Sequence, residues 1–368
     1  MCALWVNHLT LSHFRSHHIG RVDCDERPIA IYGANGAGKT NILEAVSLLS
    51  PGRGVRRASA EDMTRRPEAL GWKIQAQLHS MAQIHDIETW SNAGAARQVK
   101  IDDKIATQVA LGRVARVVWL IPSMDRLWIE GADGRRRFLD RMALSFHPSH
   151  ADHVLAYEKA MRERNRLLKD QVCDAFWYAA IEKQMSEAGV AIWATRKDTL
   201  SQIAVAQDQA ETSFPIASLN LTHADDLGFE DHEDFAQALS DTRNADIAAG
   251  RTLIGPHRDD LFGVYAAKNV PAKDSSTGEQ KAMLISLILA NGRALKDMTG
   301  AAPLMLLDEV AAHLDATRRA ALYDEICALG AQAWMTGTGP ELFEELGNRA
   351  QRIEVSETDG VSALRMIQ

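Results

Sequence analysis

Two segments at opposite ends of the chain contain residues that could bind and cleave a nucleoside triphosphate. The first segment fits the pattern G-x-x-x-x-G-K-[ST] at every fixed position, and its residues are Gly33, Ala34, Asn35, Gly36, Ala37, Gly38, Lys39 and Thr40. The second is an apolar run over residues 303–307 that ends in two adjacent carboxylates, Asp308 and Glu309. Most of the chain separates the two segments, so a long insertion divides the expected site.

Each polar residue of these segments has a chemical role that suits its type. The glycines let backbone N–H groups turn inward around the phosphates, and Lys39 adds a positive charge at the β- and γ-phosphate oxygens. The Thr40 hydroxyl is a ligand for Mg²⁺, and Asp308 would hold the same ion through water. Glu309 would act as the general base for the attacking water. The segments therefore predict a site for ATP and Mg²⁺ in which Lys39 and Glu309 are catalytic.

These motifs need strands and helices to position them. Residues 29–32 predict a short buried strand before the glycine-rich loop, and residues 40–49 predict a helix after it. Other strands are expected in the N-terminal part, at residues 5–14, 72–78, 84–90, 98–105 and 114–121. Near the C-terminus, strands at 261–265, 304–307 and 331–335 alternate with helices at 275–295 and 316–329. That alternation predicts a parallel sheet.

The character of the chain changes after Pro148. Residues 150–169 and 175–206 predict two long helices, because apolar residues recur at three- and four-residue steps and proline is absent. The second helix shows this spacing at Trp177, Ile181, Met185, Ala188, Ile192 and Thr195. The pair could form a short antiparallel arm or an ordinary helical subdomain packed on the core. Beyond it, a strand is expected at 213–222 and a helix at 234–249.

The start of the expected helix at 275–295 can be interpreted in two ways. Ser276 and Glu279 have the spacing of a helix-capping pair, and that interpretation is physically complete. The same residues, Ser276, Thr277, Gly278 and Glu279, also resemble the signature motif of ABC-type ATPases. In that family the motif closes on ATP held by a second copy of the protein. Asp315, in His313-Leu314-Asp315, resembles the D-loop of the same family, so the resemblance implies an ATP-dependent homodimer.

Across its full length the chain resembles the RecF family of bacterial recombination mediators. Besides the two ATP motifs and the signature, the segments that carry this resemblance are residues 7–15, 134–140 and 252–261, the last containing Gly255-Pro256-His257-Arg258-Asp259-Asp260. The resemblance implies a weak, DNA-stimulated ATPase that helps to load the recombinase at gapped or stalled-fork DNA. It also implies double-stranded and gapped DNA, RecO and RecR as partners. Arg15 lies where related proteins place an arginine near the nucleotide.

Two alternatives belong to other classes. A transporter ATPase subunit is disfavoured because its family usually carries a switch histidine after the last strand, whereas residues 333–338 contain none. An SMC-like structural ATPase is disfavoured because the expected arm is short. The predicted fold class is α/β: an ABC-type P-loop head with mixed and parallel sheet, plus an inserted compact helical lobe or arm. The expected domains are a discontinuous head, 1–146 and 251–368, and a helical lobe, 147–250.

Composition limits where the protein acts and how it meets DNA. The formal net charge of −8 gives no global attraction to polyanions, so DNA contacts need a local basic cluster. Arg53, Arg56, Arg57, Arg65 and Arg66 form one, which could equally be a solvated surface. The four cysteines are scattered, the N-terminal residues do not fit a signal peptide, and the longest apolar run, 283–290, is too short to span a bilayer. We therefore expect a cytoplasmic protein without membrane contact.

Histidines and a second arginine cluster give weaker signals. His147, His150 and His153 have helical spacing, but no carboxylate or cysteine completes a metal site beside them. His13, His17 and His18 are equally weak metal candidates. Arg135, Arg136, Arg137 and Arg141 precede or surround apolar residues, so a structural or nucleotide-linked role is expected for them.

Overall fold

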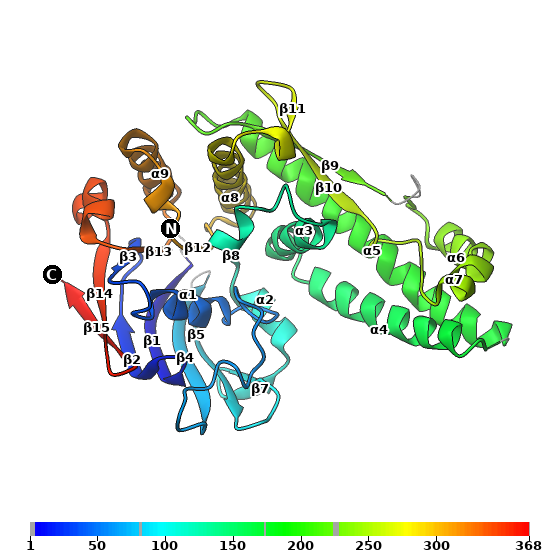
Figure 1. Ribbon diagram of the computed structural model, residues 1–368, viewed down its shortest axis with the longest axis horizontal. Coiled ribbons are helices and arrows are strands. Elements are labelled where there is room, and N and C mark those ends of the chain that lie inside the picture. Colours follow the sequence, from blue (N-terminus) through cyan, green and yellow to red (C-terminus); the bar gives the residue numbers. More distant parts are fainter. Residues whose placement is uncertain (1–3, 81–82, 173, 224–227, 368) are drawn as a thin grey trace. The chain divides into compact units, whose positions relative to one another are not determined.

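The computed structural model describes residues 4–80, 83–172, 174–223 and 228–367. Contacts divide the chain into two compact units (Figure 1). Unit 1 contains residues 1–125, 206–215 and 276–368, and unit 2 contains residues 126–205 and 216–275. The sequence-based division at residues 147 and 251 differs from these boundaries and stays a prediction about domains.

Unit 1 contains a six-stranded, largely parallel sheet that carries the two ATP motifs. Its order is β15 (Val361–Ile367), β14 (Gln351–Thr358), β3 (Ile29–Tyr32), β13 (Ala333–Gly337), β12 (Leu304–Leu307) and β8 (Val117–Leu120). All neighbours are parallel except β14 and β15. Strands β8, β12 and β13 are buried throughout, as the uninterrupted apolar runs predict. Parallel order brings the carboxyl ends of β3 and β12 to one edge, where the motifs begin.

Helices of unit 1 lie before, after or between the strands of this sheet along the chain. Helix α1 (Lys39–Ser47) starts directly after the glycine-rich loop, α8 (Thr277–Thr299) precedes β12, and α9 (Ala316–Leu329) connects β12 to β13. Short helical segments are η1 (Gln108–Ala110), α2 (Leu111–Val114), η2 (Pro122–Met124), η5 (Ala311–His313) and η6 (Pro340–Arg349). The helices expected at 40–49, 275–295 and 316–329 are confirmed, with small shifts at their ends.

A second sheet of unit 1 is antiparallel. Its order is β2 (His17–Asp23), β1 (Trp5–Phe14), β4 (Gly71–Ser80), β5 (Gln83–Asn92), β6 (Gln98–Ile101) and β7 (Lys104–Ala106). Strand β4 alternates between buried and half-buried residues, which is the pattern of a sheet with one face on the core. The sequence predicted β1, β4 and β5, whereas it gave no signal for β2, β14 and β15.

Unit 2 combines helices with a small sheet. The helices are α3 (Ala132–Phe146), α4 (His150–Lys169), α5 (Ala175–Asp208, of which the last three residues belong to unit 1), α6 (His232–Asp241) and α7 (Arg243–Ala249). The sheet has the order β11 (Val270–Pro271), β10 (Asp260–Tyr265) and β9 (Ala217–Thr222), and η4 (Ala272–Asp274) follows it. The two long helices are confirmed, and they pack within this unit rather than forming a bare two-helix arm.

The core of unit 2 explains that packing. Ile181, Met185 and Ile192 of α5 are buried against Tyr157 of α4 and Phe235 of α6. The apolar residues of α5 therefore pack against both α4 and α6. Trp177 departs from the expectation, since 61% of its surface is exposed near the start of α5.

Three expectations about secondary structure are wrong, and one expected strand is shorter than predicted. Residues 261–265 form β10, but this strand pairs antiparallel with β9 and β11 and is not part of the parallel sheet. The helix expected at 234–249 is two helices that meet at Thr242. The single strand expected at 98–105 is two strands, β6 and β7, which pair antiparallel. The strand expected at 114–121 is present but starts at Val117, because residues 111–114 form a helical turn. Among the described residues, no helix is both long and apolar enough to cross a membrane.

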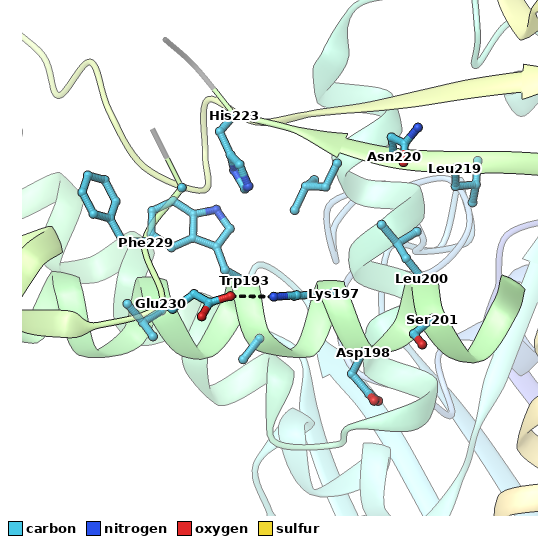
Figure 2. A pocket seen from close by; sticks show the side chains of 14 residues that line it. Trp193, Lys197, Asp198, Leu200, Ser201, Leu219, Asn220, His223, Phe229 and Glu230 are labelled. Atoms are coloured by element: carbon cyan, nitrogen blue, oxygen red, sulfur yellow. Dashed lines mark hydrogen bonds and ion pairs between the residues drawn. The ribbon is translucent and has the colours of Figure 1, made fainter. Parts of the chain in front are cut away.

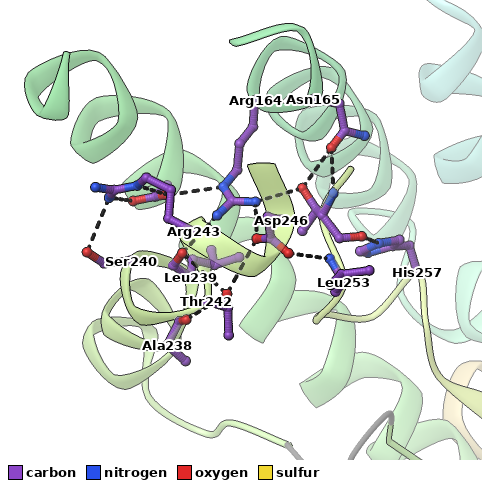
Figure 3. Close-up of polar contacts among 12 residues, drawn as sticks. Arg164, Asn165, Ala238, Leu239, Ser240, Thr242, Arg243, Asp246, Leu253 and His257 are labelled. Atoms are coloured by element: carbon purple, nitrogen blue, oxygen red, sulfur yellow. Dashed lines mark hydrogen bonds and ion pairs between the residues drawn. The ribbon is translucent and has the colours of Figure 1, made fainter. Parts of the chain in front are cut away.

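A buried polar cluster links the helices of unit 2 (Figure 3). The Arg164 side chain has no exposed surface, and its guanidinium donates to Glu182 at 3.0 Å and Asp246 at 2.6 Å. It also donates to the Thr252 hydroxyl at 2.9 Å and the Leu239 carbonyl at 2.8 Å. All four of these hydrogen-bond partners belong to unit 2. The hydrogen bonds therefore join α4 to α5, α6 and α7.

Replacing Arg164 by methionine is expected to destabilise unit 2 by about 3–5 kcal/mol, because buried Asp246 loses the cation that it contacts and Glu182 keeps only Arg243. Arg166→Met on the same helix is the matched control, since Arg166 is largely exposed and its loss should cost less than about 0.5 kcal/mol. Thermal unfolding followed by tryptophan fluorescence would compare the two. Equal midpoints for the two variants would show that the cluster does not hold the unit together.

Candidate active site

The glycine-rich loop adopts a conformation that needs glycine at its two ends. Gly33 has φ 154°, and a Cβ placed there would lie 2.0 Å from the carbonyl oxygen of Val355. Gly38 has φ 104°, and its Cβ would lie 2.3 Å from Oγ of Ser362. Any side chain would therefore push the loop away from β14 and β15. The loop leaves β3 and leads into α1, so the first N–H groups of that helix face the loop.

Lys39 lies across the loop that precedes it. Its Nζ donates to the carbonyl oxygens of Gly33 at 2.7 Å and Ala34 at 2.9 Å. Burial lowers the pKa of Lys39, and the nearby charges of Glu309 and Asp308 act in the opposite direction. The ammonium group is thus enclosed by the loop and electrostatically coupled to both carboxylates of the second motif.

The second motif meets the first at Asp308. Thr40 Oγ1 donates to the two carboxylate oxygens of Asp308 at 3.0 and 3.1 Å, across 268 positions of sequence. Thr336 Oγ1 donates to Asp308 Oδ1 at 2.6 Å. A hydroxyl and a carboxylate that converge in this way are the oxygen donors that Mg²⁺ prefers. The residues present therefore fit the ion that the sequence predicts.

Glu309 is held in an unusual backbone conformation. Its φ is 53°, which is uncommon for a residue with a side chain. Its N–H donates to Thr336 Oγ1 at 2.9 Å, so one hydroxyl fixes both members of the carboxylate pair. Such strain costs of order 1–3 kcal/mol and is concentrated at functional sites. The strained backbone and the hydrogen bond to Thr336 together hold Glu309 next to Asp308.

Three further residues support this site, of which the sequence singled out only His17, as a weak metal candidate. Thr336 lies one residue before the end of β13, beside β12, and contacts the Asp308 carboxylate and the Glu309 N–H. His17 is fully buried, and burial lowers its pKa to about 4, so it is neutral when its Nε2 meets the Gly38 carbonyl at 3.3 Å. Ser362 donates to the Ala37 carbonyl at 2.7 Å. For Thr336 the only sequence signal was a hydroxyl near the end of an expected strand.

A basic pocket lies beside the loop. We define it by its lining residues, which are Arg15, Ser16, Asn41, Arg56, Ala58, Asp62, Thr64, Arg65, Arg66 and Gly360. Glu44 of α1, whose side chain is fully buried, accepts from Arg15 at 2.7 and 2.8 Å and from Arg56 at 3.1 Å. Arg56 also donates to Asn41 at 2.6 Å. One carboxylate thus holds two of the predicted arginines against the helix that begins at the loop.

The five arginines proposed for DNA differ in their surroundings. Arg53, Arg56, Arg57 and Arg66 are exposed. Arg65 is only 6% exposed, and its guanidinium donates to the carbonyls of Ser16 at 2.8 Å and Gly360 at 2.9 Å. Arg65 is therefore bound inside unit 1. In the other cluster, Arg135 pairs with Asp260 at 2.6 and 2.8 Å, and Arg136 donates to the Asp259 carbonyl at 2.7 Å, both within unit 2.

The signature segment forms the capping pair that its spacing predicts. Ser276 accepts from the N–H of Glu279, and the Glu279 carboxylate accepts from the N–H of Ser276 at 2.9 Å. Ser276, Thr277 and Gly278 are nevertheless exposed, and a Cβ at Gly278 would meet nothing within 4 Å. Asp315 caps α9 in the same manner, accepting from Arg318 N–H at 2.8 Å. The caps leave the outer surface of the signature segment open.

A different pocket lies in unit 2, between α5 and β9 (Figure 2). Trp193, Leu200 and Leu219 line it, and Lys197 forms an ion pair with Glu230 at 2.6 Å along its wall. It contains neither ATP motif, so it is not the predicted nucleotide site.

Two of the weak histidine candidates have hydrogen-bond partners in unit 2. His147 contacts Asp198, and His150 contacts Thr195 and Asp140.

Comparison with known proteins identifies relatives over nearly the whole chain. A family model for the RecF/RecN/SMC N-terminal domain matches residues 5–362. The DNA replication and repair protein RecF of Rhizobium rhizogenes is 45% identical over 364 residues, covering 96% of this chain and 97% of its own. RecF of Brucella suis biovar 1 is 45% identical over 362 residues, covering 95% and 94%.

Solved structures agree with this fold. A structure described as the recombination mediator protein RecF with ATP in the RecFOR pathway superposes with a TM-score of 0.82 at 21% identity, covering 99% of both chains. An SMC head domain from Pyrococcus furiosus superposes with a TM-score of 0.57 at 18% identity, covering 99% of this chain and 96% of its own. The predicted ATPase-head fold, with its mixed sheet and helical elements, is confirmed.

Proposed function

The chain belongs to the RecF/RecN/SMC N-terminal domain family and, within it, to the RecF proteins, and from this premise we propose that it is an ATP-dependent DNA-binding protein of recombinational repair. Its site would use ATP hydrolysis as a switch, with slow turnover that times release from DNA. The observation that carries the ATPase part is the contact of Thr40 with Asp308 beside a complete phosphate loop. Its similarity to RecF proteins of DNA replication and repair, and to a RecF structure with ATP, supports the assignment.

The chain's own residues would bind and orient the nucleotide. Backbone N–H groups of residues 33–40 would surround the phosphates, and Lys39 would exchange its two loop carbonyls for phosphate oxygens. The basic pocket beside the loop would receive the rest of the nucleotide near Arg15. When bound, Mg²⁺ would neutralise charge on the phosphates, held by Thr40 and, directly or through water, by Asp308.

Hydrolysis needs a base aimed at the attacking water. Glu309 is next to Asp308, and Thr336 fixes the N–H of one and the carboxylate of the other. Glu309 would accept the proton of that water as the water attacks the γ-phosphorus. The bond from that phosphorus to the oxygen bridging the β-phosphate would break, which gives inorganic phosphate with ADP as the leaving group. The positive φ of Glu309 is the structural cost of separating the two carboxylate roles.

The site would be completed by a second copy of the chain. Ser276, Thr277 and Gly278 are exposed at the start of α8, and Asp315 is exposed at the start of α9. A Cβ at Gly278 would meet nothing within 4 Å, so the surface of the signature segment is open to a partner. We therefore propose an ATP-dependent homodimer in which this segment closes on ATP held by the partner. Gapped DNA and proteins of the RecO and RecR type are the proposed further partners, supported by the RecFOR pathway named for a solved relative.

The proposed function is tested by measuring ATP hydrolysis with and without gapped duplex DNA, and the mass of the protein under the same conditions by analytical ultracentrifugation. We expect a monomer without nucleotide, a dimer with MgATP, and faster hydrolysis when DNA is present. A monomer in every condition, or hydrolysis unaffected by DNA, would contradict the proposal.

The proposed DNA-contacting arginines are Arg53, Arg56, Arg57 and Arg66. Arg53 and Arg57 give the cleaner test, because Arg56 also holds Glu44 beside the phosphate loop. The double variant Arg53→Glu, Arg57→Glu should weaken DNA binding and lower the slope of log affinity against log salt by about 2, one for each lost phosphate contact. Exposed Arg162 and Arg166 on α4, changed in the same way, are the control. Equal slopes for the wild type and the first variant would remove this cluster from the DNA surface.

A further inference from the structure

We propose that His13, His18 and Glu68 form a binding site for one transition-metal dication of the Zn²⁺ type. Each offers one ligand atom, and these atoms all lie within 4.8 Å of one another. In the part of the chain that the structure describes, no other group of three histidine, cysteine or acidic side chains meets this criterion. Both histidines were weak metal candidates in the sequence. Glu68 is fifty residues from His18 in the sequence, and only the fold brings it close to them.

The backbone builds this cluster from two segments of unit 1. The pairs Ser12–Ile19 and Phe14–His17 in the β1–β2 hairpin place His13 opposite His18, and the two rings make an edge contact with centroids 4.6 Å apart. Glu68 comes from the loop over residues 61–70. That loop is fastened to the hairpin because Arg65 N–H donates to the His13 carbonyl at 2.9 Å.

Further hydrogen bonds fix the same arrangement. Arg15 N–H donates to the Met63 carbonyl at 2.9 Å, and Phe14 forms a β-bridge with Thr64. Three backbone contacts on consecutive hairpin residues therefore hold the loop beside the histidines. The site would need closure of side chains only, because the two segments that carry the ligands are already joined.

The donor set selects a class of ion. Imidazole and carboxylate groups together suit Zn²⁺ and its neighbours Co²⁺ and Ni²⁺, whereas Mg²⁺ prefers six oxygens in an octahedron. Zinc bonds of about 2.0–2.2 Å require ligand atoms closer together than the 4.8 Å limit, which small side-chain rotations can supply. Three protein ligands would leave a fourth position for water. This site is therefore chemically distinct from the proposed Mg²⁺ site at Thr40 and Asp308.

A second observation points to a missing ligand at this place. His13 Nδ1 is buried and has no hydrogen-bond partner among the described residues, and buried polar atoms are nearly always paired. Arg65 contacts Glu68 Oε1 at 3.3 Å, which would partly balance the carboxylate and leaves it able to accept at its other oxygen. A bound cation would engage His13, whose Nδ1 the described residues leave without a hydrogen-bond partner.

Occupancy would have a structural consequence. The hairpin carries Arg15 and Ser16, and the loop carries Thr64 and Arg66, all of which line the basic pocket. A metal ion bound by residues of both segments would stabilise that wall of the pocket. Any effect of this on nucleotide affinity rests on the proposed function, whereas metal binding itself does not.

The test uses the untagged full chain without nucleotide, because tags and ATP both bind metals. Zn²⁺ is titrated calorimetrically at about pH 8, where imidazoles are deprotonated and available, and Co²⁺ is followed by its visible absorption. We expect one site per chain in the wild type, and at least about tenfold weaker binding in His18→Ala and Glu68→Gln. His85→Ala is the control, since His85 contacts Asp102 at 2.7 Å without a third ligand.

The outcomes separate this proposal from the proposed function. His18 and Glu68 are exposed, so their variants should fold, and ATP binding without Zn²⁺ should match the wild type. Zn²⁺ should raise the unfolding temperature of the wild type but not of His18→Ala. Absence of Zn²⁺ binding, equal binding by all variants, or an equal loss in His85→Ala would overturn the site. Loss of ATP-driven dimerisation with Zn²⁺ binding intact would overturn the proposed function alone.

Discussion

Replacement of Glu309 by glutamine is expected to leave ATP bound while lowering kcat for its hydrolysis by about 100-fold or more. Glutamine keeps the size of the side chain and the strained backbone at φ 53°, but it cannot take the proton of the attacking water. Because hydrolysis would reset the switch, the variant should accumulate as the ATP-bound dimer. Single-turnover hydrolysis and analytical ultracentrifugation with gapped DNA would measure both effects.

The neighbouring carboxylate supplies the matched control for this experiment. Asp308→Asn is the same chemical change one residue earlier, where the side chain accepts from Thr40 and Thr336. It should weaken MgATP binding as well as hydrolysis, so no trapped dimer should form. If Glu309→Gln hydrolysed ATP at the wild-type rate, Glu309 would not be the base. If both variants lost binding alike, the two carboxylates would not have separate roles.

The local motifs of the site were predictable because their chemistry lies in consecutive residues. The phosphate loop, Asp308 and Glu309 each follow from a short pattern with a buried strand before it, and the structure brings the two motifs together at Thr40. Thr336, His17 and Ser362 were not predictable in the same way. They reach the site only because β13, β2 and β15 lie next to particular strands, and strand order is not written in any one segment.

The fold shows the same division between local and long-range information. Helices α4 and α5 were predicted from apolar spacing alone. Strand β10 was recognised as a strand but assigned to the wrong sheet, because its direction depends on β9, whose pairing register joins residues about forty positions apart. A cluster of arginines in the sequence does not show which of them are exposed. Arg65 belongs to such a cluster, but its guanidinium donates to carbonyls inside unit 1.

A bulky residue at Gly278 is expected to weaken the ATP-dependent dimer without destabilising the monomer. A Cβ at Gly278 meets nothing in its own chain, and glutamine is a better helix former than glycine by about 0.5 kcal/mol. Gly278→Gln should therefore fold at least as well as the wild type. If a partner closes on this surface, overpacking should cost about 1–3 kcal/mol, which corresponds to about a 5- to 150-fold weaker dimer.

Gly131→Gln provides the control, because Gly131 is also exposed at a helix start, has φ −64°, and has open space around its Cβ. Sedimentation with MgATP should show a dimer for the wild type and Gly131→Gln and a monomer for Gly278→Gln. ATP hydrolysis should fall in parallel, since the signature segment would complete the partner's site, whereas ATP binding to the monomer should persist. A stable Gly278→Gln dimer would mean that Ser276–Glu279 is a helix cap alone, and the composite-site mechanism would have to be abandoned.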